Sequence, residues 1–262
     1  MPEQPATSLE PTSLRGQVAI VTGASSGIGA AIAAQLVRQG THVALFARRT
    51  DRLESLVQSL TGESASGQYG ETEIVGGDVR EEQDVRRLVE RTLARWGTLD
   101  ILIANAGFGY RKALVDGDPQ RWKAMIDTNV YGLLLTLKYG GQPLIERRKG
   151  QVVVTSSVAG RVPTLGGSAY CGTKFAATAI ADVFRQEVAP LGVRVTTIEP
   201  GVVISEFQQV AEYPPDIVTN MLKGAQPLVP DDVAAAVVFA LRQPANVGFS
   251  ELVVRPSGQA FP

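Results

Sequence analysis

The chain has 262 residues, a formal net charge of −1 from 25 basic and 26 acidic side chains, and a single cysteine. The balanced charge argues against nucleic acid or an anionic membrane as partner, and one cysteine excludes an intrachain disulfide framework and a cysteine-based metal site. We therefore expect a small-molecule partner, no metal, and a reducing, cytoplasmic location.

The first fourteen residues contain three prolines and several polar side chains, which predicts a flexible tail (residues 1–14) ahead of one domain (residues 15–262). No apolar run approaches the ~20 residues that a membrane-spanning helix needs. The chain is therefore predicted to have no membrane partner.

A short apolar strand (residues 17–21) leads through a glycine-rich turn into a helix with apolar residues at helical spacing (residues 28–39). Glycines let the backbone bend and approach a ligand, and the helix N-terminus offers free N–H groups to a pyrophosphate. A plain structural turn is the alternative for such a loop. The residues predicted to bind a cofactor here are Gly23, Ser25, Ser26, Gly27, Ile28 and Gly29.

A second strand (residues 42–47) and helix (residues 51–60) complete a strand-helix-strand pattern, which is typical of a parallel, doubly wound sheet. An acid after the second strand would accept a hydrogen bond from the ribose 2′-OH of NAD. Arg48 and Arg49 stand there instead, and guanidinium groups bind a 2′-phosphate. The pattern favours NADP, with Arg48 as the better candidate, over an ordinary basic surface loop.

The third strand (residues 72–75) ends near Asp78 and Val79. Asp78 either caps the helix predicted over residues 81–96 or meets an adenine amino group. Both roles follow from its place at a strand end, and the sequence does not separate them.

The fourth strand (residues 101–103) ends at Asn105, Ala106 and Gly107, whose small side chains let the backbone pass close to a ring or sugar. A long helix is predicted from residue 122 to residue 148. Asn129 lies inside this helix, where its side chain competes for backbone hydrogen bonds.

The fifth strand (residues 152–155) is followed by Ser157 and by a helix predicted over residues 168–189. On that helix Tyr170 and Lys174 share one face, about one turn apart. A cation beside a phenol stabilises the phenolate and lowers the phenol pKa, so the pair is a candidate proton-transfer device. The spacing alone also occurs by chance.

A sixth strand (residues 193–198) ends at Pro200 and Gly201, and residues 202–230 are predicted to form a lid because they contain prolines and no clear strand. A last helix (residues 233–241) and a last strand (residues 252–254) complete the chain. The predicted fold is α/β: one Rossmann-type, doubly wound parallel sheet of about seven strands, with helices on both faces.

These motifs together resemble the short-chain dehydrogenase/reductase family, from about Leu14 to the end of the chain. The motifs that agree in order and spacing are residues 22–29, Asp78-Val79, Asn105-Ala106-Gly107, Asn129, Ser157, Tyr170 with Lys174, and Pro200-Gly201.

The resemblance implies that Tyr170 is the acid-base, Ser157 hydrogen-bonds the substrate oxygen, and Lys174 holds the nicotinamide ribose. It also implies that Asn129 orders a water molecule in a proton relay. The loop after Gly201 places Val203 and Ser205 at the cofactor, with Ser205 where the family tends to carry a threonine. Family members commonly form dimers or tetramers, so a homodimer or homotetramer is expected.

The implied function is NADP(H)-dependent interconversion of a small ketone or aldehyde and its alcohol. One alternative is a 3-hydroxy acid substrate, because the chain also resembles, more weakly, the branch with 3-hydroxy acid dehydrogenases and broad carbonyl reductases. Arg111 or Arg161 would then meet a carboxylate. A regulator that binds NADP(H) without turnover is the other alternative. Candidate pocket residues are Phe108, Tyr110, Arg111, residues 158–165, Phe207, Tyr213 and Met221.

Residues 23–27 also fit the Gly-x-Ser-x-Gly turn of hydrolases. That chemistry needs an acid and then a histidine after the serine, and no acid lies between Ser25 and His42, the one histidine. His42 is therefore predicted to be structural or on the surface. Cys171 is predicted to be a small buried side chain, because its position on the helix points it away from the face of Tyr170.

Overall fold

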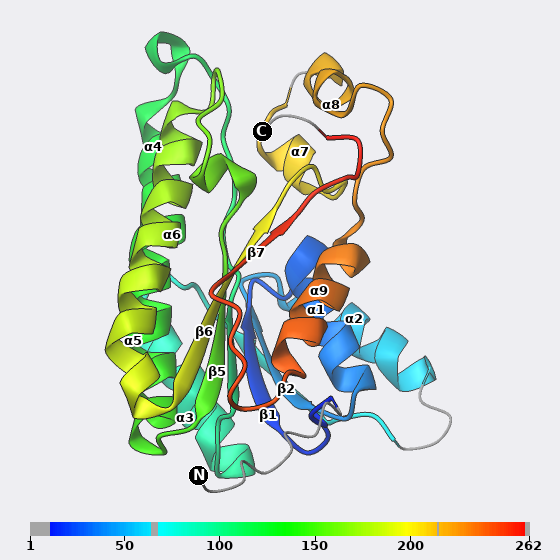
Figure 1. Ribbon diagram of the computed structural model, residues 1–262, viewed down its shortest axis with the longest axis vertical. Coiled ribbons are helices and arrows are strands. Elements are labelled where there is room, and N and C mark those ends of the chain that lie inside the picture. The colour runs from blue at the N-terminus through cyan, green and yellow to red at the C-terminus, as the bar shows by residue number, and fades with distance from the viewer. Residues whose placement is uncertain (1–10, 64–67, 214, 260–262) are drawn as a thin grey trace, which may run out of the picture.

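A sheet of seven parallel strands runs through the computed structural model, which describes residues 11–63, 68–213 and 215–259 (Figure 1). The strand order is β3-β2-β1-β4-β5-β6-β7. The strands are β1 (Val18–Thr22), β2 (His42–Ala47), β3 (Thr72–Gly76), β4 (Ile101–Ala104), β5 (Gly150–Thr155), β6 (Val193–Pro200) and β7 (Glu251–Val254).

The central strands are apolar along their whole length because both faces of the sheet are covered. In β1, Ala19 and Val21 pack into one core cluster, whereas Val18 and Ile20 pack into the other. All four side chains are at most 2% exposed. The α/β class and the seven strands predicted from the sequence are confirmed.

Helices cover the two faces separately (Figure 1). One face carries α1 (Gly27–Arg38), α2 (Thr50–Glu63) and α9 (Pro230–Leu241). The other face carries α3 (Glu82–Trp96), α4 (Pro119–Ile126), α5 (Gly132–Glu146) and α6 (Ser168–Val188). Short 3-10 turns η1 (Leu114–Asp116), η3 (Val158–Gly160) and η4 (Ala189–Leu191) lie in the connections.

The direction of winding reverses between β1 and β4. From β1 the chain proceeds outward through β2 to β3, and from β4 it proceeds the other way to β7. Crevices at such switch points, beyond the carboxyl ends of the strands, are where open α/β sheets bind ligands. The turns that follow β1, β4, β5 and β6 all meet there.

The helix predicted over residues 122–148 is interrupted. Between α4 and α5 lies a π-helical turn, η2 (Asp127–Tyr131), which contains Asn129. π-Helical turns are rare and occur frequently at functional sites. The apolar periodicity did not reveal this turn, because the turn covers only five residues between two helical segments.

One other expectation needs correction. Residues 11–14 are not a flexible tail, because the Thr12 amide donates to the Arg242 carbonyl at 2.7 Å and Leu14 is only 1% exposed. Residues 1–10 lie outside the described residues. The lid segment contains two short helices, α7 (Phe207–Val210) and α8 (Pro215–Leu222), and a parallel bridge between Val203 and Leu228.

Within the part of the chain that the structure describes, no helix is both long enough and apolar enough to cross a membrane.

Candidate active site

One cavity of about 530 Å³ lies at the carboxyl edge of the sheet. All the residues predicted from the sequence to be catalytic or to bind the cofactor line this cavity, except Asn129. The sequence did not point to several other lining residues, among them Arg80, Thr128, Thr155, Glu206 and Gln208.

The turn after β1 brings the backbone close to the strand beside it. Gly23 has a φ of +69° and Gly27 a φ of +54°, both in the region that favours glycine. A Cβ on Gly29 would lie 2.3 Å from the Gly23 carbonyl oxygen. Helix α1 then starts without a side-chain cap, so its first N–H groups remain available to an anion in the cavity.

Ser26 does not cap α1 because its hydroxyl is used elsewhere. Arg49 donates to Ser26 Oγ at 2.7 Å and to Ser25 Oγ at 3.2 Å. Arg48 is more open: its side chain is 68% exposed, and its Nη1 lies 3.9 Å from an Asp78 carboxylate oxygen. Both predicted arginines thus line the cavity.

Asp78 does not cap the helix that follows β3. Its carboxylate accepts hydrogen bonds from the Arg80 backbone N–H at 3.0 Å and from the Arg80 guanidinium, whereas α3 starts at Glu82 with no side-chain cap. Burial alone would raise the pKa of Asp78, but the bonds from Arg80 outweigh it and hold the pKa below its ordinary value. The capping alternative is therefore wrong, and an adenine contact stays a prediction.

Thr22 and Asn105 join the ends of three strands. Thr22 Oγ1 accepts hydrogen bonds from the Asn105 and Ala106 amides, at 3.0 and 3.2 Å. The Asn105 side chain donates to the Thr22 carbonyl and accepts from Thr155 Oγ1, both at 3.1 Å. These bonds fix the floor of the cavity where β1, β4 and β5 end.

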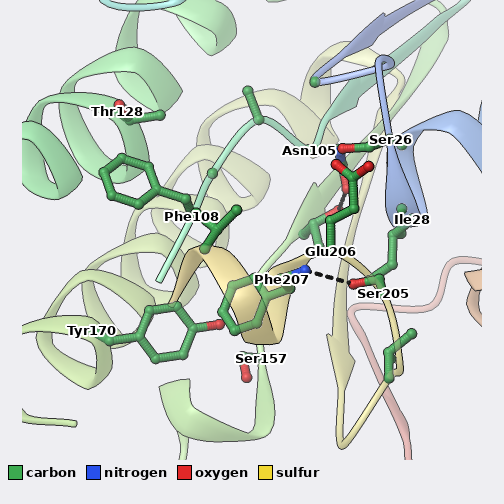
Figure 2. A pocket seen from close by; sticks show the side chains of 18 of the residues that line it. Ser26, Ile28, Asn105, Phe108, Thr128, Ser157, Tyr170, Ser205, Glu206 and Phe207 are labelled. Atoms are coloured by element: carbon green, nitrogen blue, oxygen red, sulfur yellow. Dashed lines mark hydrogen bonds between the residues drawn. The ribbon is translucent and has the colours of Figure 1, made fainter. Parts of the chain in front are cut away.

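Tyr170 and Ser157 meet on the opposite side of the cavity. Figure 2 shows the Tyr170 hydroxyl directed into the cavity, on the side where Ser157 lies. Burial raises the pKa of Tyr170 above its ordinary value, and the hydrogen bond with Ser157 opposes that rise only in part. In the protein alone Tyr170 is therefore a phenol at neutral pH.

Among the described residues, the hydrogen bond of the Lys174 ammonium goes to a backbone carbonyl and not to the Tyr170 hydroxyl. Its Nζ donates to the Thr155 carbonyl at 2.8 Å and lies 6.0 Å from the centre of the tyrosine ring. Burial lowers the pKa of Lys174 to about 8. The expectation that this cation depresses the tyrosine pKa is thus not met in the protein alone, because desolvation dominates both groups.

The Asn129 side chain uses both its oxygen and its nitrogen in hydrogen bonds to other parts of the chain. Its Oδ1 accepts from the Phe108 amide at 3.0 Å, and its Nδ2 donates to the Phe108 carbonyl at 2.8 Å and to Thr173 Oγ1 at 3.0 Å. The local competition expected for a helical asparagine is resolved by these long-range bonds. They link the strand end after β4 to α6, which carries Tyr170.

The loop after β6 lies against the same cavity, with Pro200, Gly201, Val203 and Ser205 in its lining. Ser205 Oγ accepts from the Phe207 amide at 3.2 Å, which starts α7 (Figure 2). Ser205 thus binds the backbone at the start of α7 and also lines the cavity.

Arg161 is not available to a substrate carboxylate, because its guanidinium already binds two acidic side chains. Its guanidinium bonds to Glu199, which is fully buried at the end of β6, and to Glu251 in β7. Thr178 of α6 also donates to Glu199, at 3.3 Å. This network holds β6, β7 and α6 together beside the site, and Arg161 does not line the cavity.

Arg111 does line the cavity, together with Phe108, Phe207, Tyr213 and Met221. Its guanidinium donates to Thr164 Oγ1 at 3.1 Å and lies 5.4 Å from the Tyr213 ring centre. Its Nε is buried and has no hydrogen-bond partner among the residues that the structure describes.

Other pocket predictions are also wrong. Of residues 158–165, only Val158, Ala159 and Thr164 line the cavity. Tyr110 does not line the cavity, because its hydroxyl accepts from the Asp118 amide at 3.2 Å. Leu165 is 94% exposed.

The two residues predicted to have no chemistry are structural. His42 Nδ1 accepts a hydrogen bond from the Glu71 amide at 3.0 Å, and its ring stacks on Trp96. Cys171 is buried and free.

Residues 17–214 match the family model described as short chain dehydrogenase. The chain is 40% identical over 93% of its length to a glycine betaine reductase of Emericella nidulans, but it spans only 19% of that longer protein. Among solved structures, an alcohol dehydrogenase from the archaeon Thermococcus sibiricus, complexed with 5-hydroxy-NADP, is 35% identical. Its TM-score is 0.82, over 94% of this chain and 99% of that one. A serine dehydrogenase complexed with NADP+ is 30% identical, with a TM-score of 0.84 over 94% and 97% of the two chains.

Lys174→Met should make the protein without ligands more stable near neutral pH. The unfolded chain keeps the lysine proton up to pH ~10.4, whereas burial lowers the pKa in the folded protein to about 8. Wild-type stability should therefore rise between these pH values, by about 3 kcal/mol, as the buried charge is lost. Methionine removes the charge at every pH.

Urea unfolding of both proteins, near neutral pH and at about pH 10, measures this difference. The variant also loses the bond to Thr155, which costs about 1 kcal/mol regardless of pH. The diagnostic result is therefore an advantage of the variant that shrinks as the pH rises. A stability difference that does not change with pH would contradict the buried, charged lysine.

Proposed function

The chain belongs to the short-chain dehydrogenase family, and from this membership we propose that it interconverts a small ketone or aldehyde and the corresponding alcohol with NADP(H). The observation that carries the proposal is the buried Tyr170 phenol, hydrogen-bonded to Ser157 in the same cavity as the glycine-rich turn. The cavity volume of about 530 Å³ is within the range of small-molecule sites.

The residues present fit a dinucleotide that carries an additional phosphate. The backbone at Gly23 and Gly29 leaves no room for side chains, the N-terminus of α1 is uncapped, and Arg48 and Arg49 follow β2 where an acid would favour NAD. The alcohol dehydrogenase and the serine dehydrogenase that resemble this chain were both solved with NADP or a derivative, which supports the same choice. When bound, NADP(H) supplies or accepts the hydride.

Tyr170 is the proposed proton donor and acceptor. In reduction the substrate oxygen takes the phenol proton as the carbonyl carbon gains a hydride, and Ser157 donates a hydrogen bond to that oxygen. In oxidation a phenolate takes the alcohol proton. Because burial keeps Tyr170 protonated in the protein alone, the site is prepared for the reductive direction.

Lys174 and Asn129 have supporting roles in this proposal. Lys174 lines the cavity beside Thr155 and would hold the hydroxyl groups of the nicotinamide ribose. Asn129 is assigned as a positioning residue, because its side-chain oxygen and nitrogen are bonded to Phe108 and Thr173. That it also orders a water molecule stays a prediction.

A 3-hydroxy acid is the second candidate substrate class. What supports it is Arg111, which lines the cavity with a buried Nε that lacks a partner. A planar guanidinium suits a carboxylate, and the chain is similar to a serine dehydrogenase. The aromatic side chains of Phe108 and Phe207 support the alternative of an uncharged ketone or aldehyde.

Cytoplasmic location stays part of the proposal. Its support is the single buried cysteine, which is typical of a protein in a reducing compartment.

Tyr170→Phe should lower the turnover number about 100-fold to 10,000-fold, because the acid-base group is removed. NADPH affinity, measured from its fluorescence, should change little. Cys171→Ala, which alters the buried neighbour without touching the cavity lining, is the matched control and should keep activity. Retained turnover in Tyr170→Phe would contradict the assignment of Tyr170 as the acid-base group. Tight NADPH binding without wild-type turnover on any carbonyl of a panel would favour a regulator.

Arg111→Met separates the two substrate classes. If 3-oxo acids are the substrates, the variant should raise KM for them about tenfold or more, because a charged hydrogen bond contributes about 1.5–3 kcal/mol. Uncharged ketones of the same size should be affected about twofold or less. Equal effects on charged and uncharged substrates would show that Arg111 acts only by supporting Tyr213.

We expect two or four copies of the chain to associate. Leu134 on α5 and Phe175 and Val183 on α6 are 46%, 41% and 54% exposed, and adjacent apolar side chains on a surface are typical of an interface. Sedimentation velocity of the purified protein should give the mass of a dimer or tetramer. A monomer at every concentration tested would rule this out.

A further inference from the structure

A carboxylate from the lid lies among the arginines that follow β2. Glu206, immediately before α7, accepts from Arg49 Nη1 at 3.1 Å through Oε2 and from Arg52 Nη1 at 3.1 Å through Oε1. Glu206 and Arg49 are 157 positions apart in the sequence. The two ion pairs connect the lid to the start of α2.

The same arginine also holds the glycine-rich turn. Arg49 donates to Ser26 Oγ and Ser25 Oγ as well as to Glu206. In Figure 2 the Glu206 carboxylate is directed towards Ser26 and the turn. The carboxylate therefore occupies a group of guanidinium and hydroxyl donors that suits a phosphate equally well.

The charges around this position leave room for one more anion. Arg48, Arg49, Arg52 and Arg80 supply four positive charges, and Glu206 and Asp78, which Arg80 and Arg48 contact, supply two negative ones, which leaves 4 − 2 = +2. The hydrogen bond from Arg49 holds the pKa of Glu206 below its ordinary value, so the lid carboxylate is ionised at neutral pH.

These ion pairs are too exposed to solvent to contribute much to the stability of the fold. The three side chains are 39–50% exposed, and exposed pairs contribute at most about 1 kcal/mol. A phosphate group with about two negative charges and three acceptor oxygens is a stronger ligand for the same guanidinium groups than one carboxylate. Glu206 is thus placed where a ligand can replace it.

We propose that Glu206 is an internal competitor for the 2′-phosphate of the cofactor. Its carboxylate occupies Arg49 and Arg52 in the free protein and gives them up when the phosphate binds. This inference rests on the proposed use of NADP(H) and adds a residue that sets how strongly the phosphorylated cofactor is preferred. A cofactor without the phosphate leaves the Glu206 ion pairs, and the tie to the lid, in place.

Glu206→Gln tests the competition because it keeps the size of the side chain and removes its charge. Isothermal titration of the full chain with 2′,5′-ADP and with 5′-ADP gives the two affinities without any turnover. We expect the variant to bind 2′,5′-ADP about fivefold more tightly than the wild type at low ionic strength, since about 1 kcal/mol of competition is lost. Added salt should reduce this gain. Affinity for 5′-ADP should change about twofold or less.

Glu212→Gln is the matched control. Glu212 is in the same lid and pairs with Arg121 at 2.7 Å, so the variant removes the same charge without touching Arg49 or Arg52. Equal gains in both variants would overturn the inference, because they would reflect only the net charge. So would an unchanged or weaker affinity of Glu206→Gln for 2′,5′-ADP. If instead the wild type binds both nucleotides equally, the proposed NADP(H) preference fails first.

Discussion

A parallel sheet must bring the carboxyl ends of all its strands to one edge, and the site of this protein depends on that constraint. The glycine turn follows β1, Asn105 follows β4, Ser157 follows β5 and Pro200 ends β6. Thr22 and Asn105 then fix the ends of β1, β4 and β5 relative to one another through hydrogen bonds of 3.0–3.2 Å. Because the strands are buried on both faces, the edge is rigid. Function is therefore concentrated in the turns, and stability in the strands.

Burial has opposite effects on the two groups at the centre of the site. It makes the Tyr170 phenol a weaker acid and the Lys174 ammonium a stronger one, so in the protein alone each moves towards its neutral form. A ligand that brings charge or hydrogen bonds into the cavity changes both preferences. The chain accepts a desolvated cation that it does not need for folding, which is a common compromise between stability and activity.

The periodicity of apolar residues was sufficient to predict the positions of the strands and of most helices, because each of these elements must turn apolar side chains towards the core. It was also sufficient to predict the site residues at the strand ends, because these residues directly follow the strands in the sequence. It could not reveal the π-helical turn at Asn129, which covers only five residues between two helices, or the burial of Leu14, one apolar residue in a polar stretch. Pairs such as Glu206 with Arg49, or Arg161 with Glu199, depend on a tertiary arrangement that spacing does not encode.

The π-helical turn η2 makes chain length, and not only residue identity, a determinant of this site. It holds one residue more than an α-helix would need between α4 and α5. Each residue of an α-helix advances the rotation by about 100°, so deleting one residue here would restore a regular helix and turn one helix relative to the other. Asn129 would then leave Phe108 and Thr173 although every other residue of the site remained. Relatives of this chain should therefore vary in composition across the turn more readily than in length.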